Sequence, residues 1–163
     1  MECLERFSRI LNQIFVWIAG VVLGAMVLLT CANVFFSAFR IPVRGTFELM
    51  GYGGAIITAF TLGYTQINKG HIAVDILVQR FSKRAQRILN IINYVVCTVF
   101  SALVSWQIFK YGTILKNTGE VTETLRIIYY PFIYGVSLGC ATLALVFLTE
   151  IMKSISGQME GTL

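Results

Sequence analysis

The fold of this chain is decided by residues 10–39, ILNQIFVWIAGVVLGAMVLLTCANVFFSAF, thirty residues without a charged side chain or a histidine. Three further uncharged stretches of twenty, twenty-two and twenty-three residues follow, each bounded by charged side chains. A helix that crosses the hydrocarbon core of a bilayer needs about 20 mostly apolar residues. The sequence therefore predicts an all-α integral membrane protein with four transmembrane helices. The predicted spans are residues 10–39, 48–68, 88–109 and 127–149.

Length and composition leave room for little else. The chain has 163 residues, of which 56% are hydrophobic and 13% are charged, about half the charged share of a soluble domain. We therefore expect residues 1–163 to form a single membrane domain without a soluble catalytic domain. The first stretch is far longer than the roughly 7–15 apolar residues of a signal peptide, so it is expected to stay as the first helix. At about 1.5 Å per residue it spans roughly 45 Å, so it must tilt or extend beyond the bilayer core.

Composition also argues against several classes of function. The four cysteines form no C-x-x-C pair, and we interpret them as small apolar residues rather than as disulfide or zinc ligands. The net charge of +5 is spread over the loops, so nucleic-acid binding is not expected. A single histidine is too few for bis-histidine haem ligation, and no P-loop or nucleophile elbow is present. We therefore expect no cofactor, no metal, no catalytic residues and no enzymatic activity. The cysteines are Cys3, Cys31, Cys97 and Cys140.

The loops indicate an orientation. With four spans, both termini lie on the same side as the middle loop. That side carries eight lysines and arginines, and the opposite side carries five. Because cytoplasmic loops are enriched in positive residues, both termini are predicted to be cytoplasmic.

The middle loop has its own pattern. Apolar residues recur at helical spacing over residues 72–87, and polar residues occupy the other side. Such a segment is typical of an amphipathic helix in the membrane interface, with its cations near lipid phosphates. The alternative is that this segment begins the third span as one bent helix. The cations expected to contact lipid headgroups are Arg80, Lys83, Arg84 and Arg87.

The third loop is predicted between Lys110 and Arg126. Gly119 follows a polar trio and indicates a turn. Thr122 and Thr124 are candidate caps for the last helix.

Small residues at four-residue spacing predict where helices pack closely. The second span carries four of them in succession, and the first and fourth spans carry one pair each. Small side chains at this spacing let helix backbones approach in lipid. A bulky residue at Ala55 or Ala59 is therefore expected to disrupt packing, although the neighbour can lie in this chain or in another protein. The predicted packing residues are Gly51, Ala55, Ala59 and Gly63, with Gly20, Gly24, Gly135 and Gly139.

No ionisable residue lies deep inside any predicted span. Carriers of ions or charged solutes usually contain such residues, or broken helices that expose backbone groups. Neutral polar side chains such as Ser105 and Ser137 can instead satisfy one another across helices. This pattern favours an accessory membrane protein over a carrier that works alone.

Three short motifs carry a specific resemblance. Glu48-Leu49 opens the small-rich second span, the run Gly70–Asp75 (GHIAVD) follows that span, and Tyr129–Gly135 (YYPFIYG) begins the fourth. With the four-span layout, these motifs resemble the small membrane subunit of tripartite ATP-independent periplasmic (TRAP) transporters.

The resemblance implies a function. It implies a small permease subunit in the bacterial inner membrane, paired with a large multi-span permease subunit that carries an elevator-type transport path. A periplasmic substrate-binding protein would deliver an organic acid, such as a dicarboxylate or a sialic acid, and a sodium gradient would drive uptake. The small subunit would brace the large one as a scaffold. Two other interpretations stay open: an assembly or scaffold subunit of another membrane complex, and a small homo-oligomeric carrier.

Three ionisable residues are candidate anchors at a subunit interface. Glu48 begins the second span, where a carboxylate interacts favourably with the helix dipole, or forms a salt bridge with a loop arginine or a partner. His71 and Asp75 are four residues apart and share a helix face. They form either a local pair or an anchor for the interfacial helix against the large subunit.

Overall fold

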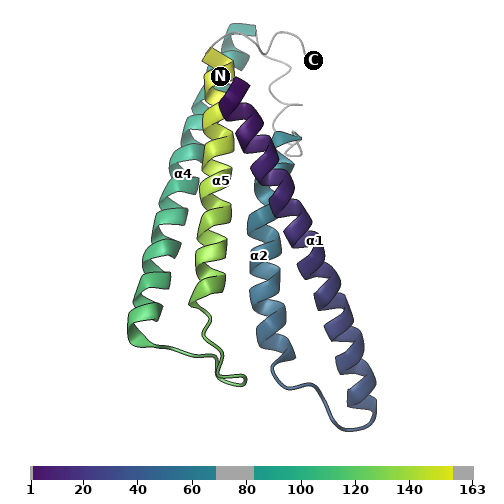
Figure 1. The fold of residues 1–163 in the computed structure, drawn as a ribbon. Helices are drawn as coiled ribbons and strands as arrows, with labels where there is room; N and C mark the ends of the chain where they lie inside the picture. Colours follow the sequence, from purple (N-terminus) through teal and green to yellow (C-terminus); the bar gives the residue numbers. More distant parts are fainter. Residues whose placement is uncertain (1, 69–82, 156–163) are drawn as a thin grey trace.

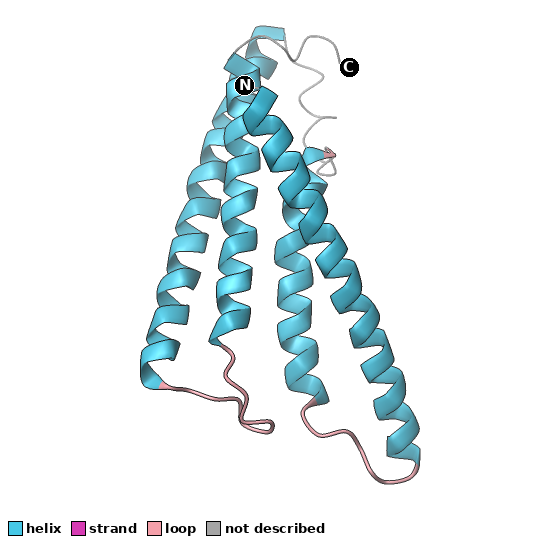
Figure 2. Ribbon diagram, in the orientation of Figure 1, coloured by secondary structure: helices cyan, strands magenta, loops and turns pink. Residues whose placement is uncertain are grey.

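The computed structural model describes residues 2–68 and 83–155 and is helical throughout its regular elements (Figure 1). In the described ranges Figure 2 shows helices joined by loops. The only β-type pairing in those ranges is one isolated bridge between Val121 and Ile128. This confirms the all-α class. The helices are α1 (Glu2–Ala38), α2 (Thr46–Ile67), α4 (Lys83–Thr118) and α5 (Tyr130–Ile155).

Three of these helices are long and apolar enough to cross a membrane. The candidate spans are Arg6–Ala38 in α1, Ile88–Thr118 in α4 and Tyr130–Lys153 in α5. Helix α2 has 22 residues, which is sufficient length, but its glycines, threonines and glutamine make it less apolar. The predicted count of four spans is therefore not confirmed by length and composition.

Two helices extend further than the uncharged stretches predict. Helix α1 has 37 residues and begins at Glu2, so at about 1.5 Å per residue it is roughly 56 Å long. It lies inclined to the other helices (Figure 1). Helix α4 continues through Lys110 and Lys116 to Thr118, where the sequence predicted a loop. Its end is set by Gly119, which has a φ of 67° and donates its N–H to the carbonyl of Leu115 at 3.1 Å, an arrangement common at helix C-termini.

The predicted interfacial helix over residues 72–87 is only partly within the described ranges. Residues 83–87 belong to α4 and continue without a break into the candidate span. The rest of that segment lies outside the described residues. The boundary expected between residues 87 and 88 is therefore absent, because one helix covers both sides of it.

Helices α2 and α5 form the centre of the bundle. Helix α4 packs along α5 on one flank, and α1 packs mainly against α2 on the other (Figure 1). The helices lie closest near the start of α1 and the end of α5, which we call the terminal end. They spread apart toward residues 39–45 and 119–129, which we call the loop end.

The core lies where α1 crosses α2. Phe15 and Phe60 stack with ring centroids 4.3 Å apart. Ala19 and Ala59 are buried beside them. At about 25 cal/mol per Å² of apolar surface removed from water, such burial is the usual driving force in aqueous solvent. Within a bilayer, close packing takes over that role.

Polar groups join α4 to α5. The Ser105 hydroxyl donates to the Ser137 carbonyl, and the Ser137 hydroxyl donates to the Ser105 carbonyl, each at 2.9 Å. The prediction that neutral polar residues satisfy one another across helices is confirmed at this pair.

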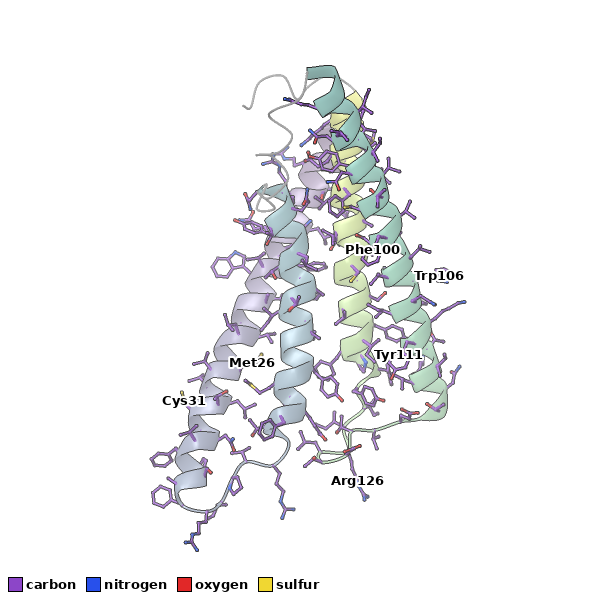
Figure 3. All side chains as sticks on the ribbon, turned by 180° about the vertical axis from the view of Figure 1, so that it is seen from behind. Met26, Cys31, Phe100, Trp106, Tyr111 and Arg126 are labelled. Atoms are coloured by element: carbon purple, nitrogen blue, oxygen red, sulfur yellow. The ribbon has the colours of Figure 1, made fainter. Side chains whose placement is uncertain are left out.

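Large apolar side chains cover the outer surfaces of α1 and α4. Trp17 on α1 and Phe100 and Trp106 on α4 are 72%, 67% and 62% exposed. Trp106 points away from the bundle, whereas Met26 lies between α1 and α2 (Figure 3). An exposed apolar surface of this extent fits lipid or a membrane partner rather than water.

Candidate functional site: the Glu48 clamp and the helix-packing contacts

Glu48 binds the loop between α4 and α5, residues 119–129, to the start of α2. Its Oε1 accepts a hydrogen bond from the Thr124 backbone N–H at 2.6 Å, and its Oε2 accepts one from the Leu125 N–H at 3.2 Å. Both carboxylate oxygens are thus used by a segment more than seventy residues further along the chain. We call this arrangement, Glu48 with the N–H groups of residues 124 and 125, the Glu48 clamp.

The loop that Glu48 holds has an ordered turn of its own. Thr122 donates its N–H to the Ile127 carbonyl at 3.0 Å, and the Ile127 N–H donates to the Thr122 hydroxyl at 3.1 Å. Arg126 adopts a φ of 52° and donates its N–H to the Thr122 carbonyl. The side chain of Thr122 is buried. The prediction that Thr122 and Thr124 cap the last helix is therefore wrong, because α5 begins only at Tyr130 and both residues serve the loop.

Aromatic rings continue the contact toward α5. Tyr52 of α2 stacks on Tyr129 at 5.6 Å and on Phe132 at 5.5 Å between ring centroids. Tyr129 is the residue before α5, and its hydroxyl donates a hydrogen bond to the Glu120 carboxylate at 2.8 Å. This hydrogen bond to a carboxylate raises the pKa of Tyr129 to about 12. The phenol therefore stays protonated, and keeps donating to Glu120, further into alkaline pH than an ordinary tyrosine does.

The salt bridge considered between Glu48 and a loop arginine is absent from the described residues. In the part of the chain that the structure describes, neither Arg40 nor Arg44 makes an ion pair with Glu48. The carboxylate also lies in the first turn of α2, where the helix dipole favours a negative charge. Backbone N–H groups of the loop take the place of the arginines.

Gly45 allows the loop to approach α2. Its φ of 76° lies in the left-handed region, and a Cβ at this position would overlap the side chain of Leu125. Leu125 is the residue whose N–H completes the Glu48 clamp. The absence of a side chain at residue 45 therefore lets the loop close over the start of α2.

This geometry predicts unequal costs for alanine at two left-handed glycines. Gly119 has a similar φ of 67° but open space around it. Gly119→Ala should therefore lower the free energy of unfolding only by the strain of alanine in the left-handed conformation, about 1–2 kcal/mol. Gly45→Ala should lower the free energy of unfolding by about 1–3 kcal/mol more than Gly119→Ala, because the added methyl group also overpacks against Leu125. Thermal unfolding of both variants in one detergent measures the difference. Equal melting temperatures would show that Leu125 does not rest on Gly45.

The predicted packing stripe of α2 divides into two halves. Ala59 is buried against α5, where a Cβ on Gly139 would lie 2.8 Å from the backbone carbon and oxygen of Ala59. Gly63 is also buried, facing α1. Gly51 and Ala55 are exposed, and nothing in the described structure lies within 4 Å of the Cβ position at Gly51. Ala59 and Gly63 thus contact helices of this chain, whereas Gly51 and Ala55 are exposed on the surface of the described structure.

The predicted glycine pairs of α1 and α5 also differ in whether another described helix lies beside them. A Cβ on Gly135 of α5 would lie 4.0 Å from the side chain of Ile56 on α2, which is an ordinary contact distance. Gly20 and Gly24 on α1 are exposed, and no described atom lies within 4 Å of their Cβ positions. The pair on α1 is therefore a packing surface without a neighbour among the described residues of this chain.

Asn12 was missed by reasoning from the sequence. Its side chain is 1% exposed, its Nδ2 donates to the Ser8 carbonyl at 2.8 Å, and its Oδ1 lies over Gly63. In the described residues this Oδ1 has no hydrogen-bond partner. The available signal was an asparagine inside an apolar run, opposite a glycine that leaves it room.

The remaining candidate residues lie beyond the described structure or at its edge. His71, Asp75 and Arg80 lie outside the described residues. Lys83, Arg84 and Arg87 lie in the first turns of α4, but their side chains are not described. Their roles as anchors and headgroup contacts stay predictions.

Comparison with known proteins gives one match. A family model described as "Tripartite ATP-independent periplasmic transporters, DctQ component" matches residues 26–157. No curated protein and no solved structure matches this chain.

Proposed function

This chain belongs to the DctQ component family of the tripartite ATP-independent periplasmic (TRAP) transporters, and from this membership we propose that it braces the large permease subunit of an organic-acid importer. The large subunit carries the transport path, and a periplasmic substrate-binding protein delivers the solute. A sodium gradient drives uptake. The substrate class is a dicarboxylate, a sialic acid or a related carboxylate.

The observation that supports the bracing role is the combination of tight contacts between helices with long uncharged stretches inside those helices. The residues between Arg9 and Arg40, and those of the other three stretches, include no ionisable side chain of the kind that carriers use. Moving an ion or a carboxylate through a bilayer usually requires such groups or exposed backbone. The helices are joined instead by backbone contact at Ala59 and by the serine pair of α4 and α5. These features suit a rigid scaffold that performs no chemistry and leaves solute movement to the large subunit.

We also propose that α2 is a fourth span. Its 22 residues suffice to cross the hydrocarbon core. The hydroxyls of Thr58, Thr61 and Thr65 donate to carbonyls one turn earlier in the same helix, which reduces the cost of placing them in lipid. Four spans put both termini on one side, and the loop charges place that side in the cytoplasm.

The contact with the large subunit is proposed for the exposed half of the α2 stripe. Gly51 and Ala55 are small and open, so another helix can approach the backbone there. The Glu48 clamp lies at the same end of α2 and fixes the loop beside it. His71 and Asp75 are proposed as a second anchor, and the basic residues near the start of α4 as headgroup contacts.

Reconstitution tests this proposal. Proteoliposomes with this chain, the large subunit and the binding protein should accumulate a labelled organic acid when a sodium gradient is imposed. Vesicles with this chain alone should show only background uptake, and vesicles without it should lose most of the activity. The chain should also co-purify with the large subunit. Uptake by the chain alone, or full uptake in its absence, would contradict the bracing role.

A further inference from the structure

An open groove runs along α1 beside the end of α2. It has a volume of about 520 Å³, within the range of about 300–1,000 Å³ for pockets that hold small ligands. Val16, Gly20 and Val21 of α1 form its apolar part. It is open because Gly20 has no side chain and no described atom lies within 4 Å of its Cβ position.

The groove becomes more polar toward the terminal end. Gln13 and Trp17 of α1 line it from one side, and Tyr64 of α2 lines it from the other. Tryptophan and tyrosine are enriched at the boundary between hydrocarbon and headgroups. Trp17 is 72% exposed and Tyr64 is 43% exposed, so both rings are available to a molecule in the groove.

Two arginines lie beyond the polar part. On a helix, Arg9 lies one turn before Gln13, and Arg6 lies nearly one turn before Arg9 on the same side. Both arginines are exposed. A guanidinium has five N–H donors, so it can bind a phosphate while it keeps another contact.

The order of these groups fits one class of molecule. From Gly20 to Arg9 the helix rises about 16 Å, with apolar residues first, then aromatic and amide side chains, then cations. We propose that this groove binds an anionic phospholipid, with an acyl chain along Gly20 and Val21 and the phosphate near Arg6 and Arg9. The occupant is a lipid rather than a protein helix because charge and polarity change along the groove in the sequence of a phospholipid's own parts.

The site is separate from the proposed contact with the large subunit. That contact involves Gly51 and Ala55 of α2, which lie toward the loop end, whereas the groove adjoins Tyr64 near the other end of α2. The lipid would fill the open space between this face of α1 and Tyr64 of α2.

Quenching of Trp17 fluorescence tests the proposal. The chain has two tryptophans, so Trp106→Phe leaves Trp17 as the only one. The full chain is reconstituted in phosphatidylcholine vesicles with increasing fractions of phosphatidylglycerol or phosphatidylcholine brominated on the acyl chains. Brominated phosphatidylglycerol should quench Trp17 with an apparent affinity about fivefold or more above that of the brominated phosphatidylcholine.

Three variants distinguish specific binding in the groove from nonspecific contact with bilayer lipid. Gly20→Phe fills the groove and should abolish the preference for the anionic lipid. Gly24→Phe is its matched control, because Gly24 is equally open but does not line the groove. Arg9→Gln should reduce the preference severalfold and leave quenching by phosphatidylcholine unchanged.

Several results would overturn the proposal. These are equal quenching by both lipids, a preference that survives Gly20→Phe, or no effect of Arg9→Gln. Loss of anionic-lipid quenching when the large subunit is added would show that the groove is a protein interface instead. That last result would leave the proposed transport role intact.

Discussion

Gly139→Ala should destabilise the bundle, whereas Gly135→Ala one turn earlier should not. A Cβ on Gly139 would lie 2.8 Å from backbone atoms of Ala59, and a backbone cannot move aside as a flexible side chain can. Overpacking of this kind costs about 1–3 kcal/mol. At Gly135 the added methyl would meet only Ile56 at 4.0 Å, and alanine favours a helix over glycine by about 1 kcal/mol. The same gain applies at Gly139, so overpacking against a rigid backbone, toward the upper end of its range, leaves a net loss of up to about 2 kcal/mol. Gly139→Ala should therefore lower the melting temperature, and Gly135→Ala should raise it.

The measurement is thermal unfolding of both variants, followed by circular dichroism in the same detergent. Ala59→Leu, on the other side of the contact, should behave like Gly139→Ala and more strongly. Ala55→Leu is its control, because Ala55 is exposed on the same helix. If Gly139→Ala and Gly135→Ala have the same melting temperature, α2 and α5 are not in contact at Ala59.

Glu48→Ala should release the loop that the Glu48 clamp holds. Both carboxylate oxygens accept backbone N–H bonds, so removing them leaves the amides of residues 124 and 125 exposed to exchange. Hydrogen exchange over residues 119–129 should become faster, on the order of tenfold or more, because a local hydrogen-bonded unit opens. Glu48→Gln keeps one acceptor oxygen and should have a smaller effect.

Glu123→Ala is the matched control for this prediction. Glu123 is an exposed carboxylate of the same loop, and in the described part of the chain it accepts no hydrogen bond. The substitution removes the same charge without removing a partner. If it accelerates exchange as much as Glu48→Ala does, loop charge and not the clamp controls this segment.

The positions of the helices follow from the sequence, but their ends do not. An uncharged run of about 20 residues is a sufficient signal for a membrane helix, because hydrocarbon tolerates little else. A helix can continue past that run into the headgroup layer, as α1 does at Glu2 and α4 does to Thr118. The end of α4 was nevertheless visible in Gly119, which takes the left-handed conformation that stops a helix.

The packing partners were harder to predict. Four-residue spacing of small residues identifies a close approach, yet it does not say what approaches. In the structure, Ala59 contacts Gly139 within the chain, and Gly51 and Ala55 remain open. Glu48 was identified as notable by its charge. Its partners were not predictable, because backbone N–H groups have no side-chain signature.

The contact between Ala59 and Gly139 joins two main chains with almost no side chain between them. A contact made by long side chains yields under load because their torsions rotate, whereas the φ and ψ torsions of a helix are held by its backbone hydrogen bonds. A force applied to α5 would therefore reach α2 with little damping. Such a joint would have low mechanical compliance, which is the property that the proposed bracing role requires.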